Sequence, residues 1–100
     1  MRISEFQKLI EETYLARDRA RGRDRTFVWF VEEVGELARA LARPRLDGGR
    51  NLREEFADVL AWLSTLASIE GIDLEAAAAG KYEKGCPRCQ SRPCVCPLSS

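Results

Sequence analysis

The sequence contains no histidine, and this absence excludes several kinds of site. A Ser/His or Cys/His nucleophilic pair needs an imidazole as its base, so neither can be built here. A metal site with histidine ligands is excluded for the same reason. The groups that remain for catalysis are carboxylates, basic side chains and four cysteines.

The chain also lacks a net charge and a long apolar run. Its 16 basic and 16 acidic residues cancel, so the overall charge gives no reason to expect nucleic acid or an anionic membrane as a partner. The first residues, MRISEFQKLIEE, carry acidic side chains where a signal peptide needs apolar ones, and no later segment approaches the length of a membrane span. We therefore expect a cytoplasmic protein with no membrane and no nucleic-acid partner.

No segment alternates apolar and polar residues as a strand requires, and apolar residues instead recur at helical spacing. The spacing predicts four helices over about 4–20, 26–43, 51–70 and 73–84. The last of these is expected to break near Gly80. The predicted start signals are capping boxes at Ser4 with Gln7 and at Asn51 with Glu54, and an Asp73 cap. The fold class is therefore all-α. Since 100 residues bury a small core, we expect a four-helix bundle that is completed by homo-oligomerisation.

Two of the predicted helices each carry an acidic pair three positions apart: Glu33 and Glu36 on the second, and Glu55 and Asp58 on the third. The first pair lies roughly 100° to 160° from the apolar centre of its helix, and the second lies roughly 80° to 140° from its own centre in the same rotational sense. The short connection over 44–50 makes the two helices antiparallel neighbours. Flanks displaced in the same sense then meet on one side, so the four carboxylates are predicted to converge.

Converging carboxylates repel one another unless cations lie among them. All-oxygen ligands favour Mg²⁺, with Mn²⁺ as a substitute, and such an ion keeps waters that can act as nucleophiles. The alternative is that these glutamates form a solvated helix flank and pair with arginines such as Arg39. One acidic pair alone favours that alternative, whereas a second pair in matched geometry favours the metal site.

The segments FVWFVEEVGELARAL and REEFADVLAWL surround these carboxylates and fill the pattern E-x-x-E, spacer, E-x-x-D. Over about 3–84 the chain resembles the MazG-type nucleotide pyrophosphohydrolases. The resemblance implies an all-α MazG-type bundle that forms a homodimer or tetramer. It also implies Mg²⁺-dependent hydrolysis of (deoxy)nucleoside triphosphates, noncanonical ones among them, to monophosphate and pyrophosphate, with the four carboxylates as metal ligands and one of them activating water.

Two alternatives to this function stay open. One is a phosphoribosyl-ATP or dUTP pyrophosphohydrolase of the same all-α group. The other is a non-catalytic helical module for binding or regulation, which would retain the acidic cluster without turnover.

Substrate-binding residues are specified less well. Family members usually have a basic residue and an asparagine after the last helix, and this chain has Lys81 and Lys84 there but no asparagine. These lysines are candidates for holding phosphates, the alternative being a solvated helix end that the helix dipole favours. The candidates for the base pocket, for which core packing is the alternative, are Gln7, Tyr14, Phe27 and Trp29. The arginines that can attract phosphates or form a solvated helix end are Arg17, Arg19 and Arg21.

The four cysteines lie between residues 86 and 96, so they cannot link distant parts of the fold. Cys86 and Cys89 have the spacing of a zinc knuckle, and Cys94 and Cys96 form a tighter pair. These residues are candidate ligands of a structural Zn²⁺. The alternatives are a disordered reduced tail or disulfides, which a cytoplasmic setting disfavours. The sequence thus divides into a helical domain over 1–85 and a Cys-rich tail over 86–100.

Overall fold

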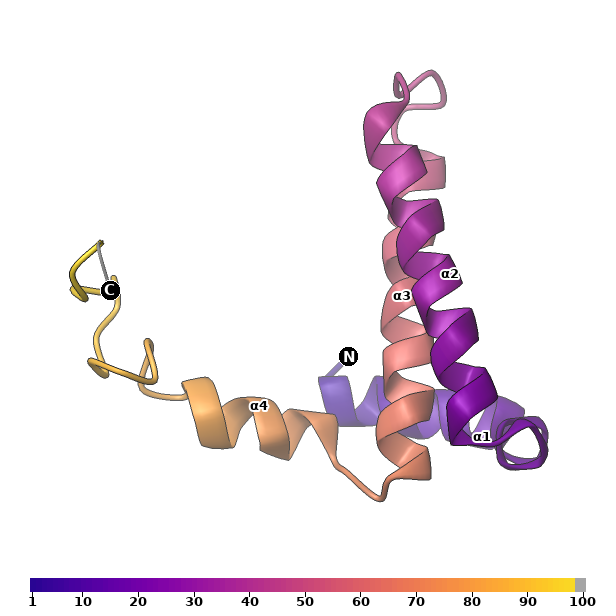
Figure 1. Cartoon of the computed structure of the whole chain (residues 1–100), viewed down its shortest axis with the longest axis horizontal. Helices are drawn as coiled ribbons and strands as arrows, with labels where there is room; N and C mark the ends of the chain where they lie inside the picture. The colour runs from indigo at the N-terminus through magenta and orange to yellow at the C-terminus, as the bar shows by residue number, and fades with distance from the viewer. Residues whose placement is uncertain (99–100) are drawn as a thin grey trace.

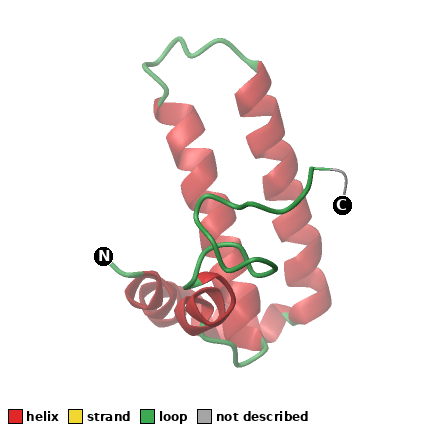
Figure 2. Cartoon of the chain, turned by 90° about the vertical axis from the view of Figure 1, so that its left-hand side faces the viewer, coloured by secondary structure: helices red, strands yellow, loops and turns green. Residues whose placement is uncertain are grey.

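The computed structural model describes residues 1–98, which form four helices and no strand. The helices are α1 (Ile3–Arg21), α2 (Arg23–Ala42), α3 (Arg50–Ile69) and α4 (Leu74–Tyr82). α2 and α3 run side by side in opposite directions (Figure 2), α1 crosses one end of this pair, and α4 extends away from it (Figure 1). The predicted all-α class is confirmed. No helix within residues 1–98 combines the length and the apolarity that crossing a membrane requires.

A single glycine separates α1 from α2. Gly22 has a φ of +85°, which glycine adopts without the clash that a Cβ would cause. Its N–H donates to the carbonyl of Asp18 at 3.0 Å, and its own carbonyl accepts from the Thr26 hydroxyl at 2.6 Å. The second helix therefore begins at Arg23, and the prediction that it begins at Thr26 is wrong by three residues.

The capping box predicted at Ser4 and Gln7 is also wrong, because α1 already begins at Ile3. The Gln7 side chain is buried and ties α1 to the connection between α3 and α4. Its amide nitrogen donates to the Ser68 hydroxyl at 3.1 Å and to the Ile72 carbonyl at 2.8 Å. Its amide oxygen accepts from the Leu74 N–H at 2.9 Å. This one side chain therefore satisfies backbone groups that the α3–α4 connection leaves without partners.

The start of α3 differs from the prediction in a similar way. Its first turn is capped by Asp47, whose carboxylate accepts from the N–H groups of Gly49 at 3.1 Å and Asn51 at 2.9 Å. Asp73 caps α4 as predicted, accepting from the N–H of the third helical residue at 3.2 Å. The predicted break near Gly80 is wrong, since α4 continues without interruption to Tyr82.

One copy of the chain buries little apolar surface. Ala40 and Ala67 are its buried apolar residues in the described part, whereas Phe27, Val28 and Phe56 are each more than half exposed. The accessible surface is 7706 Å², roughly a third more than the about 5,700 Å² expected of a compact monomer of this size. The radius of gyration is 16.3 Å, against about 13 Å for a compact domain of 100 residues. The chain is therefore open in shape, with apolar helix faces turned outward.

Candidate active site

Acidic side chains of α2 and α3 meet where these two helices pack. Glu33 from α2 and Glu55 and Asp58 from α3 each place a carboxylate oxygen within 4.8 Å of the others. Glu33 and Glu55 are half-buried and Asp58 is exposed. Mg²⁺ binds oxygen at about 2.0 to 2.1 Å, so neighbouring ligand oxygens in its octahedral shell lie about 3 Å apart. The three carboxylates therefore need only small side-chain rotations to share one ion. We call these three residues the carboxylate cluster.

The fourth predicted carboxylate lies beside the cluster. Glu36 forms an ion pair with Arg39 one turn further along α2. Both side chains are about half exposed, and an exposed pair of this kind contributes at most about 1 kcal/mol. A bound cation and its substrate can therefore compete with Arg39 for Glu36. The structure thus brings three of the four predicted residues together and gives Glu36 a different partner.

The electrostatics of the cluster are unfavourable in the absence of a cation. Burial raises the pKa of Glu33 above its ordinary value of 4.5, and the negative charges of Asp58, Glu55 and Glu36 raise this pKa further. The Oε2 atom of Glu55 is buried and has no hydrogen-bond partner among the described residues. A buried carboxylate oxygen without a donor is expensive. A divalent cation among the three groups would neutralise their charge and give this oxygen a ligand bond, so the residues present fit a hard metal ion.

A cavity of about 260 Å³ opens beside the carboxylate cluster, between α1 and α3. Asp58 belongs to both the cluster and the cavity wall. The wall combines cationic, aromatic and small residues, which are Ile10, Tyr14, Arg17, Asp18, Arg21, Asp58, Ala61, Trp62 and Thr65. Guanidinium groups bind phosphate oxygens, and aromatic rings stack on nucleobases. The cavity therefore offers both kinds of contact that a nucleotide needs next to the carboxylates.

A buried polar network holds one side of this cavity in place. The Asp18 carboxylate accepts from the Arg21 guanidinium at 3.0 Å and from the Thr65 hydroxyl at 3.1 Å. The Arg21 guanidinium also lies 4.8 Å from the centre of the Trp62 ring, at the distance of a cation–π contact. Trp29 stacks on the same ring at a centroid distance of 6.3 Å. Arg21 is thus fixed at the wall, and Trp29 supports Trp62.

Sequence reasoning missed part of this arrangement. Asp18, Trp62 and Thr65 were not among its candidates, although Asp18 and Arg21 at a spacing of three along a helix are a visible pairing signal. Of the predicted base-pocket residues, Tyr14 lines the cavity and Gln7 is engaged in the α3–α4 connection.

The predicted phosphate-binding lysines lie at the far end of the chain's helical part. Lys81 is in the last turn of α4 and Lys84 follows that helix. α4 extends away from the α2–α3 pair (Figure 1), and neither lysine lines the cavity beside the carboxylate cluster of its own chain.

A model of the MazG nucleotide pyrophosphohydrolase domain matches residues 21–92. The chain belongs to this family. The MazG match includes α2, α3 and α4, and therefore both acidic pairs, whereas most of α1 lies outside it. No curated protein is similar enough in sequence to count as a match. Membership of the MazG family implies a nucleotide pyrophosphohydrolase, which is a hydrolase, and enzymes of this family typically use divalent metals.

The raised pKa of Glu33 predicts how stability responds to Mg²⁺. Because folding raises this pKa, the folded state holds the proton more tightly, and the stabilisation from protonated Glu33 is lost as the pH rises from the ordinary value of 4.5 through the raised one. At pH 7 without divalent metal, Glu33→Gln should therefore unfold at the same or a higher urea concentration than the parent. With 10 mM Mg²⁺, about tenfold above the ~1 mM dissociation constants of weak oxygen-ligand sites, only the parent of these two should gain stability.

Glu54→Gln is the matched control, because Glu54 is exposed on the same pair of helices and lies outside the carboxylate cluster. It should respond to Mg²⁺ as the parent does. Equal Mg²⁺ stabilisation of the parent and of Glu33→Gln would contradict a metal site at Glu33.

Proposed function

We propose that the protein hydrolyses a nucleoside triphosphate to its monophosphate and pyrophosphate, using Mg²⁺ or Mn²⁺ held by Glu33, Glu55 and Asp58. The observation that carries the proposal is the buried, unpartnered oxygen of Glu55 among three close carboxylates. The adjoining cavity and the membership of the MazG family support it. An acidic surface that served only solubility would have no reason to bury such an oxygen beside a cationic and aromatic cavity.

In the proposed reaction, water attacks the α-phosphorus, the bond from this phosphorus to the bridging oxygen breaks, and pyrophosphate leaves. A divalent cation supplies charge neutralisation and a lowered pKa of water when it is bound. Glu36 accepts the proton of the attacking water, because it is the carboxylate that stays outside the cluster while lying close enough to raise the pKa of Glu33. Arg39 holds the Glu36 side chain next to the site until substrate arrives.

In this proposal, residues of the cavity wall bind the phosphates and the base of the substrate. Arg17 and Arg21 line the cavity with positive charge, and Arg21 is held there by Asp18. Tyr14 offers a ring surface for the base, and Trp62, which contacts Arg21 and Trp29, forms the neighbouring part of the wall. Trp29, which the sequence analysis names as a candidate for the base pocket, supports the wall of the cavity by stacking on Trp62.

We also propose that the active unit is a homodimer or tetramer, in which a second copy covers the apolar faces of α2 and α3. The exposed large apolar residues on these helices include Phe27, Val28, Val31, Phe56 and Leu60. Apolar side chains exposed together along neighbouring helices are typical of an interaction surface. α4 has no buried residue in one copy, and the exposed Lys81 at its end, with Lys84 just after it, would then hold phosphates in the site of a neighbouring copy.

The first test is pyrophosphate release from a panel of canonical, damaged and deoxy nucleotides with Mg²⁺, Mn²⁺ or chelator. Phosphoribosyl-ATP and dUTP belong in the panel because they separate the two related activities. Asp58→Asn and Glu36→Gln should each lower kcat by at least about 100-fold, the usual effect of losing a catalytic carboxylate. Glu54→Gln should retain the parental rate. If the parent turns over no member of the panel, or if Asp58→Asn leaves turnover unchanged, the protein is better described as a binding module.

The second test concerns which copy supplies the lysines. Chains carrying Asp58→Asn and chains carrying both Lys81→Ala and Lys84→Ala should each be poorly active alone. When co-expressed as a random dimer, about a quarter of the sites combine an intact cluster with intact lysines from the other copy. Activity should recover to that fraction. Mixed oligomers without recovery would show that the lysines do not serve a neighbouring site, and full activity of the double lysine variant would exclude them from phosphate binding.

A further inference from the structure

The segment after α4 brings four sulfur atoms together. The Sγ atoms of the tail cysteines lie within 4.8 Å of one another. Cys86 and Cys96 are 3.8 Å apart, and Cys89 and Cys94 are 4.0 Å apart, with all four present as free thiols. In a tetrahedral zinc site with Zn–S bonds of about 2.3 Å, neighbouring sulfurs lie about 3.8 Å apart. We infer that the tail is a closed Zn²⁺ site whose ligands are Cys86, Cys89, Cys94 and Cys96.

The backbone around the first cysteine pair is folded tightly enough to present both thiols to one ion. Gly85 has a φ of +94°, and a Cβ at this position would lie 2.6 Å from the carbonyl oxygen of Ser91. The Cys86 N–H donates to that same oxygen at 3.0 Å, and the Gln90 N–H donates to the Cys86 carbonyl at 2.6 Å. Gln90 completes the loop with a φ of +56°. Position 85 therefore requires glycine, and the loop brings Gln90 and Ser91 back into contact with the backbone of Cys86.

Backbone groups also point at the sulfurs. The Val95 N–H donates to the Cys89 Sγ at 3.5 Å, and the Cys96 N–H donates to the Cys94 Sγ at 3.4 Å. Donors of this kind orient metal-bound thiolates and offset part of their negative charge. The tail further carries Arg88 and Arg92 within the cysteine loop. Their positive charges lower the net charge of a tail in which four thiolates around one Zn²⁺ would carry a formal charge of about −2.

Apolar packing does not account for the fold of the tail. Val95 is 70% exposed and Leu98 is fully exposed, so the tail buries almost no apolar surface that could offset the entropy of ordering it. A metal bound by four thiolates supplies that free energy, as in small domains that fold only around zinc. The ligand set also separates this site from the carboxylate cluster, since thiolates favour zinc and carboxylates favour magnesium.

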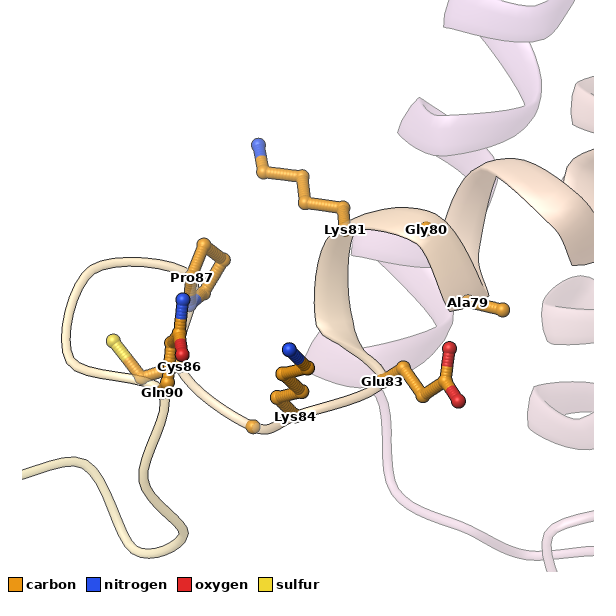
Figure 3. Close-up of a pocket in the computed structure, with 9 residues that line it drawn as sticks. Ala79, Gly80, Lys81, Glu83, Lys84, Cys86, Pro87 and Gln90 are labelled. Carbon is orange, nitrogen blue, oxygen red and sulfur yellow. The ribbon is translucent and has the colours of Figure 1, made fainter.

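The sulfur spacing favours a single ion. An iron–sulfur cluster places several irons and sulfides between its cysteines, and sulfurs within 4.8 Å of one another leave no room for them. Because all four ligands come from the protein, no coordination position is open for substrate, and the role of the site is structural. It would fix the loop side of a cavity of about 260 Å³ that Lys84, Cys86 and Gln90 line together with the end of α4 (Figure 3).

The test is the metal content of the full chain, purified under reducing conditions and measured by mass spectrometry. About one zinc per chain is expected, as four thiolates specify. Co²⁺ exchanged into the parent should give the visible absorption of a tetrahedral thiolate site. Cys89→Ser and Cys94→Ser should each lower zinc content at least about 10-fold. Val95→Ala is the matched control, because this exposed residue lies between two ligands, and it should keep the metal.

Removal of zinc should also make the tail susceptible to trypsin after Arg88, while Pro93 protects the bond after Arg92 and the helical circular dichroism signal is retained. Zinc below about a tenth of an equivalent in the parent would overturn the proposal. So would bound iron in its place, zinc retained by Cys89→Ser, or a mass lower by the hydrogens lost in disulfide formation. None of these readouts depends on nucleotide turnover, so this proposal can fail while the proposed hydrolysis stands, and the reverse.

Discussion

Three carboxylates come close together where α2 packs on α3, and their mutual repulsion has to be offset by the surrounding structure or by a cation. Packing of the two helices places Glu33, Glu55 and Asp58 within 4.8 Å of one another. At such distances each pair of unit charges repels by roughly 1 kcal/mol even in water, and by more where the pair is partly buried. The raised pKa of Glu33 and the unpartnered oxygen of Glu55 are the two consequences visible in the structure. A cation relieves both at once, which links the stability of the helix pair to its proposed chemistry.

The open shape of the single chain agrees with the proposal that the protein works as an oligomer. A compact monomer would turn the apolar faces of α2 and α3 inward, and a single copy leaves them exposed. The polar network of Asp18, Arg21 and Thr65 instead joins α1 to α3 at the cavity wall. In our proposal a second copy supplies the missing apolar burial, while this network and the carboxylate cluster keep the cavity beside the metal.

The parts of the fold that depend on helical periodicity could be predicted from the sequence, and those that depend on side-chain choice between distant elements could not. Matched offsets on antiparallel helices place Glu33, Glu55 and Asp58 on one side, and the structure has them there. The partner of Glu36 is a local choice of side-chain conformation, which periodicity does not specify. Gln7 has the sequence pattern of a cap, yet bonds across the fold to Ile72 and Leu74. Asp18 and Thr65 are 47 residues apart in the sequence, and no short motif predicts a hydrogen bond between residues so far apart.

The most direct measurement is titration of the protein with Mn²⁺ followed by electron paramagnetic resonance, because it detects the bound ion without requiring a substrate. The parent should bind Mn²⁺ at a site that Mg²⁺ competes for, and Glu55→Gln should weaken that binding at least about 10-fold. Glu54→Gln, one residue away and outside the carboxylate cluster, should bind as the parent does. Mn²⁺ binding that is absent in the parent, or unchanged by Glu55→Gln, would contradict a cation site between α2 and α3.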